Sequence, residues 1–167
     1  MKAKKIYILG GTGSGKTTLA EKLSNILKIK HYSTDNFVYK KKWSISYSKE
    51  QKEKNIEKIT KNKKWIIEGV HADTWCIPTI KKADLIIFID KHRFSLFSGV
   101  LKRELKLIGY KKDTIKSLPK LLYYAYIYKK GHRHKHKNSL KQAREFIILK
   151  NNKEINQFVL KFQDSQK

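Results

Sequence analysis

The sequence predicts a single α/β domain in which a parallel β-sheet lies between two layers of helices. Short runs of β-branched and aromatic residues alternate along the chain with longer segments of helical periodicity. The run 85–89, Leu-Ile-Ile-Phe-Ile, is apolar throughout, as in strands that are covered on both faces of a parallel sheet. Because a chain of 167 residues suits one domain and no repeat or linker divides it, we expect 1–167 to fold as one unit.

The elements of this three-layer domain can be placed in order along the chain. The expected strands cover 5–9, 30–34, 65–67, 85–89 and 146–149, and the expected helices cover 18–27, 48–61, 94–109, 114–131 and 155–162. Helix 48–61 is mostly polar, with only Ile56 and Ile59 as apolar anchors, and 78–82 is expected to be a brief connector. The stretch 109–140 is the least regular and most charged part of the chain, and we expect a mobile lid there.

A glycine-rich segment between the first strand and the first helix is the most specific motif. Residues 10–17 read Gly-Gly-Thr-Gly-Ser-Gly-Lys-Thr, which matches G-x-x-x-x-G-K-[ST] without a mismatch. Such a turn aims backbone N–H groups at an anion, and the helix N-terminus adds partial positive charge. The sequence therefore predicts a nucleoside triphosphate site, in which Lys16 reaches the β- and γ-phosphates and Thr17 ligates Mg²⁺. The expected binding residues are Gly10, Gly11, Thr12, Gly13, Ser14, Gly15, Lys16, Thr17 and Thr18.

Three of the expected strands end in an acidic residue: Asp35, Glu68 and Asp90. Ligands of open parallel sheets bind beyond the carboxyl ends of the strands, so these acids should meet the glycine-rich segment in one crevice. Asp90 follows five apolar residues and is expected to hold Mg²⁺ directly or through water. Asp35 is expected to orient or deprotonate an attacking hydroxyl, and Glu68 either binds a substrate hydroxyl or is the base in place of Asp35. The alternative for each acid is a helix cap or a solvent-facing turn residue.

The four arginines all lie in the second half of the chain, where they can supply bidentate contacts to phosphate. We expect Arg103 and Arg144 to contact the transferred phosphate group. Arg93 and Arg133 either do the same or lie on the solvated surface. The segment 132–137 alternates histidines with cations and is expected to be a basic lid tip or a solvated loop; a metal site is less favoured because no acid or cysteine lies nearby.

The composition limits the partners and the compartment. A net charge of +25 suggests contact with nucleic acid, but it comes from 35 lysines and only 4 arginines, and the lysines are spread along the whole chain. A generic basic surface is thus favoured, with nonspecific nucleic-acid contact as the alternative. The single cysteine, Cys76, excludes an internal disulfide and fits a reducing cytoplasm, and no apolar run is long enough to span a membrane. We expect a cytoplasmic protein that makes no membrane contact.

Several segments together resemble the bacterial DNA topology modulation protein family, a group of adenylate-kinase-like P-loop proteins. They are Gly10–Thr18, Asp35, 65–69, 83–90, the Lys102-Arg103 pair and 147–151, and they follow the same order over nearly the whole chain. The resemblance implies a fold of the nucleoside-monophosphate-kinase type with strand order 2-3-1-4-5. It further implies ATP on the glycine-rich segment, a helical lid that opens with Lys102 and Arg103, and 150–152 bordering the adenine.

One departure from that pattern concerns the substrate. Adenylate kinases usually show Asp-Gly-Phe-Pro-Arg after the third strand, whereas this chain has Glu68-Gly69-Val70-His71 and no arginine before residue 93. The arginine that would grip AMP is absent, which argues against AMP as the acceptor. The sequence therefore predicts an ATP-dependent phosphotransferase acting on a small hydroxyl-bearing or nucleotide acceptor. The alternatives are a DNA-associated ATPase and a nucleotide binder without turnover; intact Lys16, Thr17 and Asp90 argue against the latter.

Overall fold

The computed structural model describes residues 3–40, 45–107, 114–128 and 131–165. Within these ranges one parallel sheet has the strand order β2-β3-β1-β4-β5, so the predicted strands and their order are confirmed. The strands are β1 (Lys5–Gly10), β2 (His31–Ser33), β3 (Trp65–Gly69), β4 (Leu85–Ile89) and β5 (Phe146–Leu149). The helices are α1 (Lys16–Leu27), α2 (Asp35–Val38), α3 (Lys49–Thr60), η1 (Thr74–Cys76), α4 (Ile77–Lys82), α5 (Arg93–Leu107), α6 (Thr114–Tyr128), α7 (His132–Leu140) and α8 (Asn152–Asp164).

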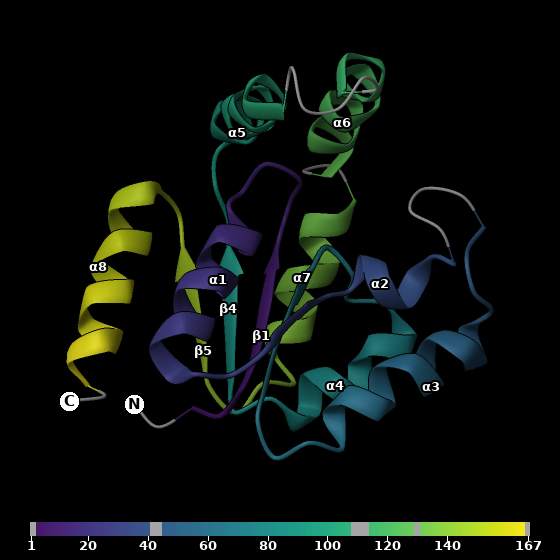
Figure 1. Ribbon diagram of the computed structural model, residues 1–167, viewed down its shortest axis with the longest axis vertical. Coiled ribbons are helices and arrows are strands. Elements are labelled where there is room, and N and C mark those ends of the chain that lie inside the picture. Colours follow the sequence, from purple (N-terminus) through teal and green to yellow (C-terminus); the bar gives the residue numbers. More distant parts are fainter. Residues whose placement is uncertain (1–2, 41–44, 108–113, 129–130, 166–167) are drawn as a thin grey trace.

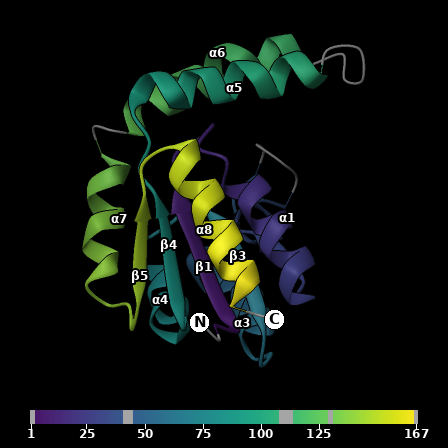
Figure 2. The same cartoon turned by 90° about the vertical axis from the view of Figure 1, so that its left-hand side faces the viewer.

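Helices cover both faces of the sheet. Helices α1 and α8 pack on one face, and α3, α4 and α7 pack on the other (Figure 1). Helices α5 and α6 lie side by side across the carboxyl ends of the strands, at the top of Figure 2. This arrangement puts the ends of β1 and β4 beneath the α5–α6 pair, at the edge where the sequence places the phosphate-binding segment.

The core follows from the alternation of side chains along buried strands. In β1, Ile6 and Ile8 face α1 and α8, whereas Tyr7 and Leu9 face the opposite layer. Strands β3 and β4 are buried over their full length. The apolar run of β4 is therefore covered on both faces, as its sequence predicted.

The structure departs from the predicted elements in the connections. Residues 77–82 form α4, preceded by η1, where the sequence suggested a brief connector, and 35–38 form the unpredicted short helix α2. Residues 132–137, one alternative for which was a solvated loop, are part of the helix α7, whose His136 is buried. A role of this segment as the tip of a lid stays a prediction. The predicted helix ends at 108–109 and 129–130 lie outside the described residues. None of the helices in the described ranges is both long and apolar enough to cross a membrane.

Candidate phosphate-binding and catalytic site

The glycine-rich segment forms a turn between β1 and α1 that is open to an anion. Gly13 has a φ of 78° and Gly15, the N-cap of α1, has a φ of 94°, both in the left-handed region that favours glycine. No side chain caps the N-terminus of α1, so its first N–H groups have no side-chain acceptor. Within the described part of the chain, the buried Ser14 Oγ has no hydrogen-bond partner. These groups fit a bound phosphate chain.

Helix α5 lies directly against this turn. A Cβ at Gly13 would overlap the carbonyl oxygen of Leu96, and a Cβ at Gly99 would overlap the carbonyl oxygen of Gly13. On the other side, a Cβ at Gly11 would lie 2.7 Å from the ring of Tyr128, the last residue of α6. The turn is therefore held between the α5–α6 pair and the sheet by contacts that need glycine at these positions.

Three of the predicted site residues influence Lys16 electrostatically. Its Nζ donates a hydrogen bond to the Gly11 carbonyl at 2.9 Å. Burial lowers the pKa of Lys16, the carboxylates of Glu68 and Asp35 act to raise it, and the Arg103 guanidinium lowers it further. The predicted site residues Asp35, Glu68 and Arg103 therefore lie within electrostatic range of Lys16. The Nε of Arg103 itself donates to Glu104 Oε1 at 2.8 Å.

Glu68 also contacts the predicted metal ligand. The Thr17 hydroxyl donates to Glu68 Oε1 at 3.1 Å, and Glu68 is buried at the end of β3. The sequence expected Thr17 to act with Asp90, so the structure adds Glu68 to the oxygen donors beside Thr17.

Asp90 forms a bidentate ion pair with Arg133 of α7. Arg133 Nε donates to Oδ1 at 2.7 Å and Nη2 donates to Oδ2 at 2.6 Å. The Asp90 side chain is 7% exposed and that of Arg133 is 33% exposed. The hydrogen bonds to Asp90 raise the pKa of Arg133. The sequence left open whether Arg133 contacts phosphate or lies on the solvated surface; the structure pairs it instead with the predicted metal ligand Asp90.

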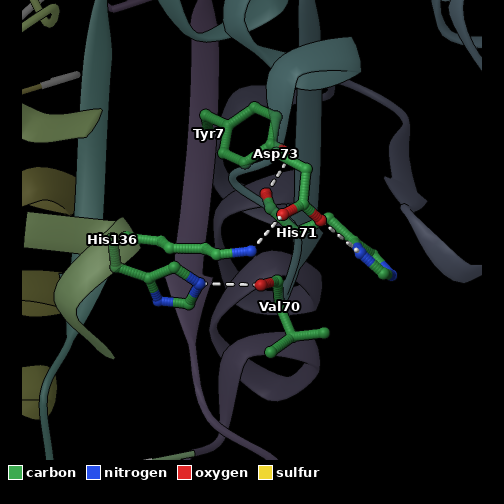
Figure 3. Close-up of polar contacts among 6 residues, drawn as sticks. Tyr7, Val70, His71, Asp73 and His136 are labelled. Carbon is green, nitrogen blue, oxygen red and sulfur yellow. Dashed lines mark hydrogen bonds and ion pairs between the residues drawn. The ribbon is translucent and has the colours of Figure 1, made fainter. Parts of the chain in front are cut away.

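A buried histidine connects α7 to the residue after β3. His136 Nε2 lies 2.7 Å from the Val70 carbonyl, which can only accept a hydrogen bond (Figure 3). Nδ1 therefore accepts from the Tyr128 hydroxyl, 2.9 Å away. Burial lowers the pKa of His136 to about 4, so the ring is neutral at pH 7.

The segment 70–73 is fixed by further polar contacts, also drawn in Figure 3. The Tyr7 hydroxyl of β1 donates to the His71 carbonyl at 3.0 Å, and Lys135 Nζ donates to Asp73 Oδ1 at 2.9 Å. A hydrogen bond from His71 and the contact with Lys135 lower the pKa of Asp73. This segment stands where the adenylate kinase pattern would place its AMP-binding arginine, and here it is tied to β1 and α7.

A pocket of about 270 Å³ lies beside the N-terminus of α1. Lys91 Nζ donates to Asn152 Oδ1 at 2.6 Å there, which joins the residue after Asp90 to the start of α8. The pocket is lined by Gly15, Thr18, Leu19, Lys22, Lys91, Asn152, Ile155 and Asn156. Of the residues that the family resemblance placed at the adenine, Asn152 lines it.

Two arginines lie elsewhere. Arg144 is exposed and precedes β5 at the amino-terminal edge of the sheet, opposite the edge at which Asp90 lies. The structure therefore does not bring Arg144 to the phosphate turn, because parallel strands start at the edge opposite the site. Arg93 stacks on Tyr126, with its guanidinium carbon 4.9 Å from the ring centre. Among the described residues, no three His, Cys, Asp or Glu side chains form a group that could hold a metal.

Comparisons with known proteins agree with this geometry at the level of the fold. No family model matches the chain. It is 34% identical over 87 residues to "Uncharacterized protein YqaC" of Bacillus subtilis, covering 52% of this chain and 48% of that protein. It is 26% identical over 107 residues to "Putative adenylate kinase" of Saccharolobus islandicus, covering 59% and 54%. The chain thus spans about half the length of the curated relatives it matches.

The structural similarity extends over the whole chain. A shikimate kinase from Bacteroides thetaiotaomicron superposes with a TM-score of 0.61 at 15% identity, covering 98% of each chain. The protein has a P-loop kinase fold. The adenylate-kinase-like part of the sequence resemblance is supported, whereas membership of the topology modulation protein family is not established.

Sequence reasoning did not identify several residues of this site. His136 was considered only as part of the basic segment 132–137, Tyr128 was not assigned to the site, and Gly99 was not recognised as a contact of the phosphate turn. A signal for α7 was present, because Arg133 and His136 are three residues apart and so share a helix face. A glycine within the apolar pattern of 94–109 was a signal for close backbone approach.

Proposed function

We propose that this chain is a phosphotransferase that moves the γ-phosphate of Mg·ATP to a small hydroxyl-bearing or nucleotide acceptor. The observation that carries the proposal is a phosphate-binding turn whose Thr17 hydroxyl contacts Glu68 and whose Lys16 lies within electrostatic range of both Glu68 and Asp35. A turn that only bound a nucleotide would not need two carboxylates on the side away from the nucleoside pocket. The P-loop kinase fold supports the same reaction class.

The chain offers separate positions for the two ends of the nucleotide. Gly10–Thr18 would bind the phosphates through backbone N–H groups, with Lys16 exchanging its bond to the Gly11 carbonyl for phosphate oxygens. The pocket beside Gly15 would hold the nucleoside next to the hydrogen-bonded side chains of Lys91 and Asn152. Helix α5 covers the turn and would exclude water from the transfer.

The oxygen donors at the turn fit Mg²⁺. Thr17 supplies a hydroxyl, and Glu68 and Asp90 supply carboxylates at the ends of β3 and β4. We propose that Thr17 and Asp90 hold the ion, with Glu68 orienting the Thr17 hydroxyl. Bound there, Mg²⁺ would neutralise charge that develops on the phosphate oxygens.

Asp35 is the favoured general base. Glu68 is buried and engaged by Thr17, whereas Asp35 is only partly buried at the start of α2. The acceptor O–H bond would break as its proton passes to Asp35, the acceptor oxygen would bond to the γ-phosphorus, and the bond to the ADP oxygen would break. Lys16 and Arg103 would stabilise the negative charge that develops on ADP.

Turnover assays with purified protein test the proposal. ATP and Mg²⁺ would be supplied with a panel of nucleosides, nucleoside monophosphates and small polyols, and with duplex DNA in a separate arm. We expect ADP release that requires one small acceptor and yields its phosphorylated product. Lys16→Ala should abolish it, while Lys61→Ala, which changes an exposed lysine on α3, should not. Turnover raised by DNA alone, without a phosphorylated acceptor, would instead favour the DNA-associated ATPase.

The two carboxylates should be separable by kinetics. We expect Asp35→Asn to lower kcat by about 10²- to 10⁴-fold with little effect on the Mg²⁺ requirement, the usual range for loss of a general base. Glu68→Gln should mainly raise the Mg²⁺ concentration needed for half-maximal rate, because it acts through Thr17. The reverse pattern would assign the base to Glu68.

A further inference from the structure

We propose that Arg133 is paired with the Asp90 carboxylate in the nucleotide-free protein, and that Mg²⁺ replaces it there when the nucleotide binds. The inference rests on the proposed function and assigns Arg133 a role in controlling metal entry. It starts from the bidentate pair, in which one guanidinium contacts both oxygens of the acid that the sequence places at the metal.

The environment of Asp90 explains why a cation belongs there. The side chain is almost completely buried, and an unpaired carboxylate in such a place costs several kcal/mol by order of magnitude. Asp90 follows Ile89, which pairs with Gly10, so this charge lies at the base of the phosphate turn. Without a metal ion, Arg133 supplies positive charge directly at both oxygens of this carboxylate.

The same oxygens cannot serve both cations fully. Both Asp90 oxygens accept hydrogen bonds from Arg133 at 2.7 Å or less. A guanidinium held so close would repel a Mg²⁺ ion at its oxygen-ligand distance of about 2.1 Å from the same carboxylate. Metal binding at Asp90 therefore competes with the ion pair.

Arg133 can leave without undocking its helix. The α7 helix is held independently by His136 on the Val70 carbonyl, by Lys135 on Asp73 and by the buried Leu140. The Arg133 side chain is one-third exposed, so a route away from Asp90 is open. The exchange needs rotation of one side chain and no rearrangement of the fold.

The test is the Mg²⁺ concentration that gives half-maximal thermal stabilisation of the full chain at saturating ADP. We expect Arg133→Gln to lower the melting temperature without ligand, because Asp90 loses its bidentate ion pair. The same variant should need about tenfold less Mg²⁺, the order expected when a charge-assisted bidentate pair no longer competes. Arg133→Lys keeps the charge but not the bidentate geometry, so its Mg²⁺ requirement should lie between those of wild type and Arg133→Gln. It also provides the test if Arg133→Gln does not fold.

Two further variants separate competition from general destabilisation. Lys135→Gln removes the ion pair between Lys135, which also lies on α7, and Asp73. This variant should leave the Mg²⁺ requirement unchanged. In an Asp90→Asn background, Arg133→Gln should no longer change that requirement. An unchanged or higher requirement in Arg133→Gln, with wild type stabilised normally, overturns the inference alone. Absence of any Mg·ADP stabilisation of wild type overturns the proposed function and the inference with it.

Discussion

At the scale of single residues, His136 is a titratable group that the fold keeps neutral. Its two ring nitrogens are taken up by the Val70 carbonyl and the Tyr128 hydroxyl, and its ring is fully buried. A second proton on Nδ1 would oppose the hydrogen that Tyr128 donates. Folding therefore selects the neutral ring and lowers the pKa from 6.5 to about 4.

The free energy of unfolding should consequently decrease as the pH is lowered from about 6.5 to about 4. The unfolded chain takes up a proton at His136 in this range while the folded chain does not, so the free energy of unfolding decreases as the pH falls. The pKa difference of His136 between the unfolded and folded chain corresponds to a decrease of about 3 kcal/mol in the free energy of unfolding, at 1.36 kcal/mol per pKa unit. Urea unfolding at pH 7 and pH 4.5 measures most of it, and His136→Gln should be markedly less sensitive.

The matched control is His134→Gln, an exposed histidine on the same helix. This variant should keep the pH dependence of wild type. Because burial also lowers the pKa of His132, some dependence of the same sign should remain in His136→Gln. Equal pH dependence in His136→Gln and wild type would contradict the assignment.

At the scale of elements, the docking of α5 depends on a glycine contact between two backbones. Gly99 packs against the Gly13 carbonyl, so the helix rests on the phosphate turn without side chains between them. Alanine within a helix is normally favoured over glycine by up to about 1 kcal/mol. At Gly99 the steric overlap should reverse that sign.

Gly99→Ala should lower the free energy of unfolding by about 1–3 kcal/mol, as overpacking does, and should weaken ADP binding because α5 is displaced from the turn. Urea unfolding and a fluorescent-nucleotide titration measure the two effects. Gly131→Ala is the matched control, because a Cβ there meets nothing within 4 Å. A Gly99→Ala protein as stable as wild type, with unchanged affinity, would show that α5 is not docked as described.

The elements that sequence reasoning recovered are those whose patterns depend on burial alone. Strand β4 was predicted to the residue because five consecutive apolar side chains report a strand covered on both faces. Helix α7 was missed because its buried face contains His136 and Ser139, whose polar side chains find hydrogen-bond partners only in the fold. Hydropathy does not contain that information.

The sequence could predict the positions of those site residues that follow from the order and direction of the strands alone. Asp35 and Glu68 were placed near Lys16 because parallel strands end at one edge. Arg144 was assigned to the site from its residue type, and the start of β5 puts it at the other edge. The pairing of Arg133 with Asp90 depends on how α7 packs, which no local pattern specifies.

At the scale of the whole molecule, a net charge of +25 on 167 residues should attract any polyanion. We expect duplex DNA to bind without sequence preference, and the affinity to fall by orders of magnitude between about 50 and 200 mM salt. Fluorescence anisotropy with two unrelated duplexes measures this. Binding that persists at high salt and distinguishes the duplexes would contradict a generic basic surface.

The position of the phosphate turn beneath α5 also has a mechanical consequence. Fifteen helical residues span about 22 Å, and the contact with Gly13 lies in the first half of that length. A tilt of α5 by about 5° around its contact with Gly13 would move the carboxyl-terminal end of the helix by between about 1 and 2 Å, at about 1.5 Å of rise per residue. A small adjustment of the turn is thereby magnified at the distal end of α5, so an event at the nucleotide phosphates can be reported at a surface remote from them.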